Sequence, residues 1–246
     1  MNIESSLHKY IYEEIVPRYA DFDAAHREDH VLTVISQAIM LMEGRDAWLE
    51  HMDCQADKND PEDRKSPEDR SDQDNVAEEW KADIRADILI TAAACHDLGL
   101  VNGRDRHHLD SGEIIRNDSR LLEWFSQDEI ETIAQAAEDH RASGKSDPRS
   151  IYGKIVAEAD RVIEQNDIIR RTLLFGQKHY PELSKEEHIE RAVSHLKEKY
   201  GRGGYLKLWI PWSSNAARLA ELQDLIADEP ELRVIVEELY MNIKTE

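Results

Sequence analysis

Apolar residues recur every three or four positions through most of this chain, and no segment alternates apolar and polar residues as a half-buried β-strand would. This period places the apolar side chains on one face of an α-helix, so the sequence predicts an all-α fold. Helical spacing is found at residues 3–16, 29–42, 76–95, 113–125 (interrupted near 117–118), 126–140, 149–163 and 184–200, and in two further helices that begin at about 213 and 230.

One segment interrupts the helical pattern. Residues 53–75 hold almost no apolar side chains, and a six-residue sequence at 61–66, PEDRKS, is nearly repeated at 67–72 as PEDRSD. Such a composition cannot bury enough apolar surface to offset the entropy that is lost on ordering, which predicts a disordered, mobile acidic insertion. We therefore expect a core domain at residues 1–165, which contains this insertion, and a C-terminal helical extension at 166–246 that packs on the core.

A histidine and an aspartate end the most apolar helix of the chain. His96 comes four residues after Ala92 and Asp97 comes four after Ala93, so both side chains belong to inward rows of that helix. A neutral imidazole beside a carboxylate suits a divalent cation, and the small residues before the pair let another backbone approach. A His-Asp pair alone also fits a histidine that is capped in the core, so the interpretation depends on further ligands.

Two further polar residues lie on inward faces of predicted helices. His30 and Asp160 are each four residues from a valine of the same apolar stripe. A carboxylate on an apolar face is unfavourable unless it is paired, hydrogen-bonded or metal-bound, and Arg161 cannot pair with Asp160 because adjacent helical residues face apart. A ligand role for Asp160 is therefore favoured. His26, one turn before His30, is interpreted as a polar turn residue.

The segment after the His-Asp pair is rich in charged and imidazole side chains. Residues 101–112 contain two glycines and the side chains of Arg104, Arg106, His107 and His108. This composition is typical of an active-site loop and fits a solvated loop equally well. Three more such residues come at the end of the helix that begins near 126: His140, which lies on its apolar stripe, Arg141 and Lys145.

In chain order, the inward groups His30, His96 with Asp97, and Asp160 form the pattern H…HD…D. This pattern resembles the HD superfamily of metal-dependent phosphohydrolases, and it is most similar to small bacterial HD-domain proteins. The resemblance covers about residues 20–165 and includes Ala159-Asp160-Arg161, which is similar to the family's terminal signature. It implies an HD-domain helical bundle with additional C-terminal helices.

The resemblance implies that His30, His96, Asp97 and Asp160 bind a divalent ion, which could be Mn²⁺, Mg²⁺, Fe²⁺, Co²⁺ or Ni²⁺. It also implies that a metal-activated water attacks phosphorus. Cations that would hold phosphate oxygens are Arg104, Arg106, Arg141 and Lys145. His108 or His140 would be a general acid or a ligand of a second ion, and His107 is a weaker candidate for the same roles. Leu100 stands where many members carry a lysine, which leaves the catalytic acid or base open.

The leading hypothesis is a phosphohydrolase that acts on a small phosphate ester or nucleotide. Two alternatives stay open. One is a non-catalytic sensor that binds a nucleotide or phosphorylated metabolite in the same metal pocket. The other is a di-iron oxygenase, which would need a second complete set of ligands. The sequence does not identify the substrate, the metal or the oligomeric state.

Composition restricts the partners and the compartment. With 52 acidic and 31 basic residues, the net charge of −21 argues against a duplex nucleic-acid surface and against anionic membranes. The longest apolar runs are far shorter than the roughly 18 residues of a membrane-spanning helix, and the first residues lack the features of a signal peptide. The two cysteines, Cys54 and Cys95, are far apart. Together these features predict a reduced, cytoplasmic protein.

Overall fold

The computed structural model of the chain describes residues 3–23, 26–56, 80–144 and 146–243. These residues form helices joined by turns and loops and contain no β-strand, which confirms the all-α prediction. The chain divides into two compact units, Met1–Asp160 (unit 1) and Arg161–Glu246 (unit 2). The packing of the C-terminal helices on the core stays a prediction.

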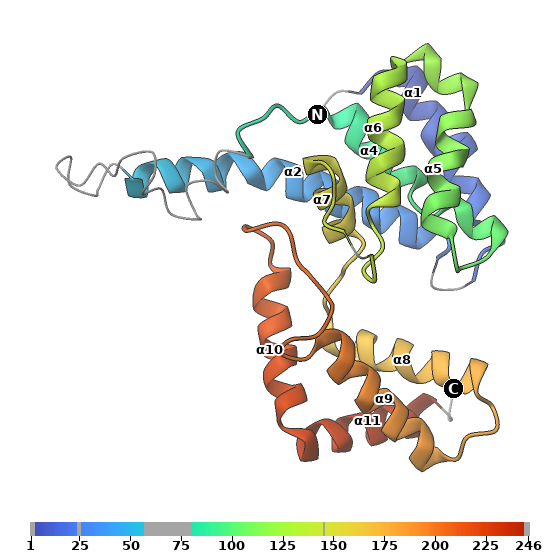
Figure 1. Cartoon of the computed structure of the whole chain (residues 1–246), viewed down its shortest axis with the longest axis vertical. Coiled ribbons are helices and arrows are strands. Elements are labelled where there is room, and N and C mark those ends of the chain that lie inside the picture. The colour runs from blue at the N-terminus through green and yellow to red at the C-terminus, as the bar shows by residue number, and fades with distance from the viewer. Residues whose placement is uncertain (1–2, 24–25, 57–79, 145, 244–246) are drawn as a thin grey trace. The chain divides into compact units, whose positions relative to one another are not determined.

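Unit 1 is built around helix α4 (Ala86–Cys95), in which every residue from 88 to 95 is buried. Three helices pack against α4: α2 (Glu28–Ala56), α6 (Gln127–Glu138) and α7 (Ile151–Ala159) (Figure 1). A helix that is surrounded in this way needs apolar or small side chains on every face, which explains why its second half lacks a polar stripe. The other elements of unit 1 are α1 (Ser5–Tyr10), the π-helical turn η1 (Ile11–Ile15), α5 (His107–Asn117), and the 3₁₀ turns η2 (Val16–Tyr19), η5 (Leu98–Asn102) and η6 (Ser119–Glu123).

Helix α2 is longer than the helix predicted at 29–42, since it runs from Glu28 to Ala56. Its last turns contain good helix formers such as Ala, Leu, Met and Glu, and the apolar stripe is no longer required there because the helix is largely exposed. The guanidinium of Arg45 donates to the carbonyl oxygen of Ala82 at 2.8 Å. Because α2 ends at Ala56, residues 53–56 of the predicted insertion are helical. Residues 57–75 of that insertion lie outside the described part of the chain.

The predicted helix 76–95 is wrong at residues 81–85, which form a turn followed by an extended segment. Helix α4 begins only at Ala86, because Arg85 is extended (φ −79°, ψ 119°). In this conformation the backbone N–H of Arg85 donates to the hydroxyl of Tyr152 at 3.0 Å, a bond to α7 that a continuous helix would replace. Residues 76–79 lie outside the described part.

Two other boundaries matter for the site. The predicted loop 101–112 is shorter in the structure, because α5 already begins at His107. The predicted helix 149–163 is also shorter: the hydroxyl of Ser150 accepts the N–H of Gly153 at 3.2 Å and begins α7, which ends at Ala159. Asp160 therefore lies at a helix end, whereas the sequence placed it within a helix. Ser126 and Glu129 form a capping box at the start of α6, which confirms that this helix begins near residue 126.

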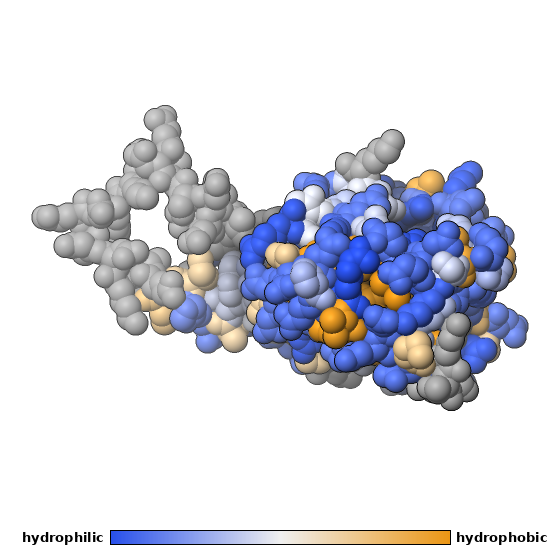
Figure 2. All heavy atoms as spheres, turned by 90° about the horizontal axis from the view of Figure 1, so that it is seen from below, coloured by the Kyte–Doolittle hydropathy of each residue, from blue (hydrophilic) through white to orange (hydrophobic). Residues whose placement is uncertain are grey.

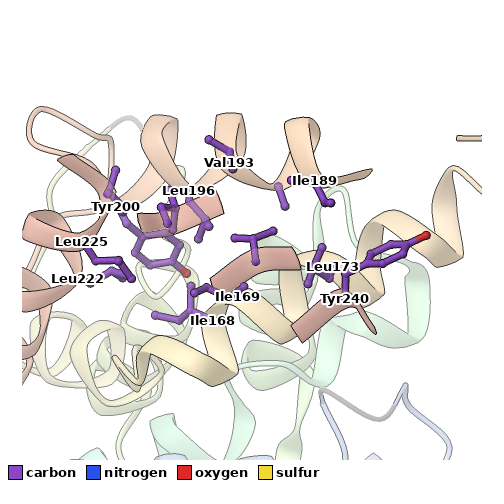
Figure 3. Close-up of a cluster of buried hydrophobic side chains, with 14 of the residues drawn as sticks. Ile168, Ile169, Leu173, Ile189, Val193, Leu196, Tyr200, Leu222, Leu225 and Tyr240 are labelled. Carbon is purple, nitrogen blue, oxygen red and sulfur yellow. The ribbon is translucent and has the colours of Figure 1, made fainter. Parts of the chain in front are cut away.

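Unit 2 consists of α8 (Gln165–His179), α9 (Lys185–Tyr200), α10 (Asn215–Ala227) and α11 (Glu229–Ile243). Ser184 and Glu187 form the capping box of α9. The four helices enclose an apolar cluster, part of which is drawn in Figure 3, and its largest members come from all four helices: Ile168, Ile169, Leu173, Ile189, Leu196, Tyr200, Leu222, Leu225, Leu232 and Tyr240. Unit 2 thus has a hydrophobic core of its own.

No helix in the described ranges combines the length and the hydropathy that crossing a lipid bilayer requires. On the face drawn in Figure 2, hydrophilic side chains predominate and hydrophobic ones form small separate groups. This surface agrees with a composition in which 34% of the residues are charged.

Candidate metal centre

A first group of polar side chains in unit 1 consists of His30, His96, Asp97 and Asp160. His30 lies in the first turn of α2, His96 and Asp97 follow α4, and Asp160 follows α7. Nε2 of His30 lies 3.3 Å from Oδ1 of Asp160 and 3.8 Å from Oδ2 of Asp97. Nε2 of His96 lies 3.4 Å from Oδ2 of Asp97 and 3.9 Å from Oδ1 of Asp160. The fold therefore brings the four residues of the H…HD…D pattern together.

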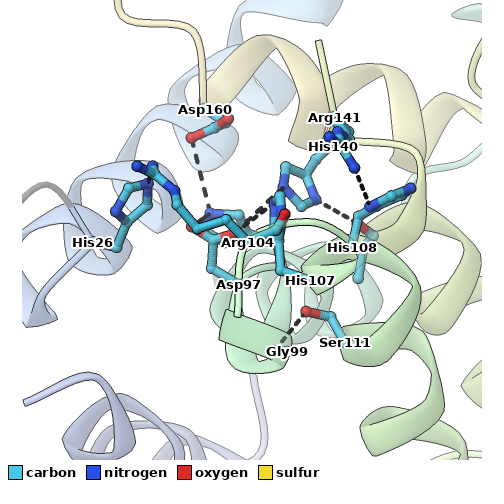
Figure 4. Close-up of polar contacts among 12 residues, drawn as sticks. His26, Asp97, Gly99, Arg104, His107, His108, Ser111, His140, Arg141 and Asp160 are labelled. Carbon is cyan, nitrogen blue, oxygen red and sulfur yellow. Dashed lines mark hydrogen bonds and ion pairs between the residues drawn. The ribbon is translucent and has the colours of Figure 1, made fainter. Parts of the chain in front are cut away.

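A second group shares Asp97 with the first (Figure 4). Its other members are His107, the first residue of α5, and His140, which lies just beyond the end of α6. Both Nε2 atoms lie 3.4 Å from Oδ1 of Asp97, and they lie 3.2 Å from each other. Each carboxylate oxygen of Asp97 thus faces one group of histidines.

His107 is the residue of this group that the sequence undervalued. The sequence ranked His108 above His107, but His107 is the one that faces Asp97, and His108 belongs to neither group. Adjacent residues of a helix face about 100° apart, so the start of α5 decides which of the two imidazoles faces the centre. No pattern in residues 101–112 gives that starting point.

The histidines that follow or begin helices have one ring nitrogen fixed by the backbone. In His96, His107 and His140, Nδ1 is hydrogen-bonded to the carbonyl oxygen three residues earlier, at 2.7 Å in the first two. A carbonyl oxygen only accepts hydrogen bonds, so Nδ1 carries the proton in each ring. In the neutral rings Nε2 therefore presents a lone pair to the carboxylate of Asp97, which is the tautomer that metal ligands need.

This arrangement fits divalent ions. Lone pairs that face one another across 3.2–3.9 Å repel unless a proton or a metal ion lies between them. Nε2 of His30 and Nε2 of His96 are buried and have no hydrogen-bond partner in the described part of the chain. Two ligand atoms about 2.1 Å from one ion lie roughly 3.0–3.4 Å apart, which matches much of this spacing. Imidazole nitrogens and carboxylate oxygens together suit Mn²⁺, Fe²⁺, Co²⁺ or Ni²⁺.

The electrostatics of the centre also favour a bound cation. Burial by itself would lower the pKa of His96, but the carboxylates of Asp97 and Asp160 outweigh burial and raise that pKa to about 9. Burial would raise the pKa of Asp97, yet His96 and His140 hold it well below its usual range. The carboxylates thus require positive charge beside them, which a proton on His96 supplies in the absence of metal.

Tyr19 and Ser111 hold the turn that carries Asp97. The buried hydroxyl of Tyr19 donates to the carbonyl oxygen of Ala94 at 2.8 Å and accepts the N–H of Asp97 at 3.3 Å. The hydroxyl of Ser111 accepts the N–H of Gly99 at 2.9 Å. A Cβ at Gly99 would lie 2.0 Å from the carbonyl oxygen of His107, so a glycine is needed for α5 to approach this closely. The glycine thereby allows the imidazole of His107 to reach Asp97.

Arg104 lies close to the first group through His26. Its Nη2 lies 2.9 Å from Nε2 of His26, whose Nδ1 lies 2.7 Å from Oδ1 of Asp23. The rings of His26 and His30 have centroids 5.7 Å apart. His26 is therefore the turn residue expected from the sequence and also a neighbour of the candidate ligand His30. It positions the half-exposed guanidinium of Arg104 beside the centre.

Arg141 lies close to the second group through His108. Its Nη1 donates to the carbonyl oxygen of Asp105 and lies 3.4 Å from Nδ1 of His108. Burial and the charge of Arg141 lower the pKa of His108 to about 4. His108 is therefore neutral at pH 7, where a general acid would have to carry a proton, and this argues against the acid role considered for it.

Of the two remaining predicted cations, Arg106 does not contribute to this geometry. Arg106 is exposed, and its Nη2 lies 3.9 Å from Asp110 and 3.6 Å from Glu113, so it pairs with its own helix. Lys145 lies outside the described residues.

The comparisons with known proteins identify the fold family. A family model of the HD domain matches residues 73–164. This segment of the chain is an HD domain. The matched part of the HD domain contains Asp97 together with His96, His107, His140 and Asp160, whereas His30 precedes it. The comparisons with curated proteins and with solved structures give no match.

Proposed function

We propose that the HD domain is a metal-dependent phosphohydrolase that uses two divalent ions and acts on a small phosphate ester or nucleotide. The observation that carries this proposal is the meeting of two ligand groups at one carboxylate, Asp97. The HD superfamily to which the domain belongs is one of metal-dependent phosphohydrolases. The two arginines beside the centre, Arg104 and Arg141, favour a substrate that carries a phosphate group.

In this proposal the two groups of side chains would each hold one ion. His30, His96 and Asp160 would hold one ion, His107 and His140 would hold the other, and Asp97 faces both groups. When bound, such ions would supply Lewis-acid chemistry that polarises a phosphoryl oxygen and lowers the pKa of a bound water. Hydrogen bonds to backbone carbonyl oxygens hold the imidazoles of His96, His107 and His140 in place, so these rings need little reorganisation when ions bind.

The arginines hold the substrate. The guanidinium of Arg104 is oriented by His26, which accepts its N–H group while donating Nδ1–H to Asp23. Arg141 is oriented by the carbonyl oxygen of Asp105. Both retain N–H donors for phosphoryl oxygens, and their positive charge stabilises the negative charge that develops on these oxygens in the transition state.

A second candidate function is oxidation by a di-iron centre. This chemistry requires a second complete ligand group, and His107 and His140 with Asp97 provide one. The arginines beside the centre make this candidate the weaker of the two, because an uncharged substrate would leave them without a role. A non-catalytic phosphometabolite sensor is the remaining alternative.

We expect this protein to act in the cytoplasm on a small phosphorylated metabolite. Both cysteines are free thiols, Cys54 exposed and Cys95 buried, in keeping with a reducing compartment.

A metal-by-substrate screen tests the proposal. The metal-stripped full chain is reloaded with Mn²⁺, Mg²⁺, Fe²⁺, Co²⁺ or Ni²⁺ and offered nucleotides and sugar phosphates, and the release of phosphate or pyrophosphate is measured with O₂ uptake in parallel. Turnover with phosphate release supports the hydrolase. Stoichiometric binding without turnover would favour the sensor, and O₂ uptake with Fe²⁺ alone would favour the oxygenase.

A pair of arginine variants sharpens the screen. Arg104→Met should keep its metal and lower kcat/KM by on the order of 10², about 2.7 kcal/mol, because it removes a charge beside the reacting phosphate. Arg106→Met is the matched control and should change kcat/KM little, since Arg106 pairs with Asp110 and Glu113. Equal effects of the two substitutions would contradict the role given to Arg104.

A further inference from the structure

A groove in unit 2 is lined by polar groups that the metal centre does not use. It has a volume of about 430 Å³, within the range of small-molecule sites. Helix α9 contributes four of its lining residues and the loop after α8 contributes two. They are Arg191, Ser194, His195 and Glu198, with Tyr180 and Leu183. We call this the Arg191 groove.

Helix α8 fixes the side chain of Arg191 in the groove. Nη2 of Arg191 donates to the carbonyl oxygen of Thr172, and the guanidinium carbon lies 5.8 Å from the ring centroids of Phe175 and of Tyr180. A Cβ at Gly176 would lie 2.6 Å from Nη2, so the guanidinium packs directly on the backbone of α8. The planar group is therefore oriented before any ligand binds, which reduces the entropy that is lost on binding.

The positive charge of Arg191 is not balanced by a carboxylate in the described part of unit 2. Two other arginines of this unit do have such partners, since Arg202 pairs with Asp224 and Arg233 pairs with Glu190. Nε of Arg191 is buried without a hydrogen-bond acceptor. Burial lowers the pKa of Arg191, as expected for a charge without a counter-ion. A half-buried arginine of this kind is unfavourable in the free protein and gains from a bound anion.

We propose that the Arg191 groove binds the oxyanion, carboxylate or phosphate, of a small organic molecule. The guanidinium fork matches the geometry of either group, and the hydroxyl of Ser194 lies in the same lining. The ring of Tyr180, which is 42% exposed, offers an apolar face to the body of the ligand. Glu198 disfavours a second negative group. The ligand class is therefore a flat, apolar molecule with one anionic group.

Binding is measured on the full chain in EDTA, which removes the metals that would hold an anion at the HD centre. The probes are benzoate for a carboxylate and phenyl phosphate for a phosphate ester. Their binding is measured by calorimetry or by NMR of the probe. Saturable binding of either probe supports the proposal, and the better probe identifies the oxyanion. Absence of saturable binding by both probes at millimolar concentration would overturn it.

Two substitutions of arginine distinguish the groove from any other anion site. Arg191→Met should abolish saturable binding. Arg202→Met removes the same charge from an exposed ion pair of unit 2 and should leave binding unchanged. Unchanged binding in Arg191→Met would overturn the proposal.

A substitution at Ser194 keeps the test decisive if Arg191→Met does not fold. Ser194 is exposed and lies three residues after Arg191, on the same face of α9. Ser194→Glu places a carboxylate beside the guanidinium and should raise Tm and abolish binding of the probes, relative to the neutral control Ser194→Gln. Equal Tm and equal binding in the two variants would contradict the proposal.

Discussion

The two candidate ligand groups of the metal centre share Asp97 but are built in different ways. The first takes His30 from the first turn of α2, and takes His96 and Asp160 from just beyond the ends of α4 and α7. The second takes His107 and His140 from the beginning of one helix and from just beyond the end of another. His96, Asp160 and His140 continue the apolar stripe of the helix that precedes them, so the helical period identifies them, whereas His107 depends on the residue at which α5 begins.

The largest effect that this comparison predicts is that of Asp97→Asn. Because one oxygen of Asp97 faces each group, the variant should lose both ions and lower phosphate release by on the order of 10³. Elemental analysis measures the metal content, and a phosphate assay measures the rate of phosphate release. Asp105→Asn is the matched control. One tightly bound ion remaining in Asp97→Asn would mean that the groups are independent.

A smaller effect is expected when a ligand belongs to one group only. Asp160→Asn should lose the ion of the first group, and His140→Gln should lose the ion of the second. Each variant should therefore retain one ion per chain after dialysis, and the two variants should differ in which affinity is lost. Loss of both ions in either variant would show that the groups bind metal only as a pair.

Gly99→Ala should perturb the second group alone, without removing a ligand. The added Cβ would meet the carbonyl oxygen of His107 at 2.0 Å and push the start of α5 away from Asp97. The affinity for the second ion should fall roughly 10- to 100-fold, as is usual when the support of a ligand is lost, while the first ion is retained. Titration with Mn²⁺ measures both affinities. An equal loss at both sites would contradict the role given to Gly99.

The smallest effect is expected for Tyr19→Phe, which acts on the shared ligand. It removes the hydroxyl that bonds the N–H of Asp97 and the carbonyl oxygen of Ala94. Losing such buried bonds costs roughly 1–3 kcal/mol, and both ions should bind about tenfold more weakly. Tyr205→Phe, at a half-exposed position, is the control. A change confined to one ion would argue against a shared carboxylate.

The sequence predicted the fold class and selected the four residues of the H…HD…D pattern, which the fold brings together, because the helical period is a local property of the chain. It did not predict that α4 begins at Ala86, since the bond between the Arg85 N–H and Tyr152 joins residues far apart in sequence. For the same reason it could not choose His107 over His108. The groove at Arg191 was also missed, because an arginine without a partner cannot be recognised before its neighbours are known.

The most direct test of the account is electron paramagnetic resonance of the full chain loaded with Mn²⁺ to saturation. If Asp97 bridges the two groups, the chain binds two ions per molecule and their spectrum is that of a magnetically coupled pair. The coupling should disappear in Asp160→Asn and in His140→Gln, which each keep one ion. A saturated wild-type chain that shows only the spectrum of isolated Mn²⁺ would contradict the shared-carboxylate centre.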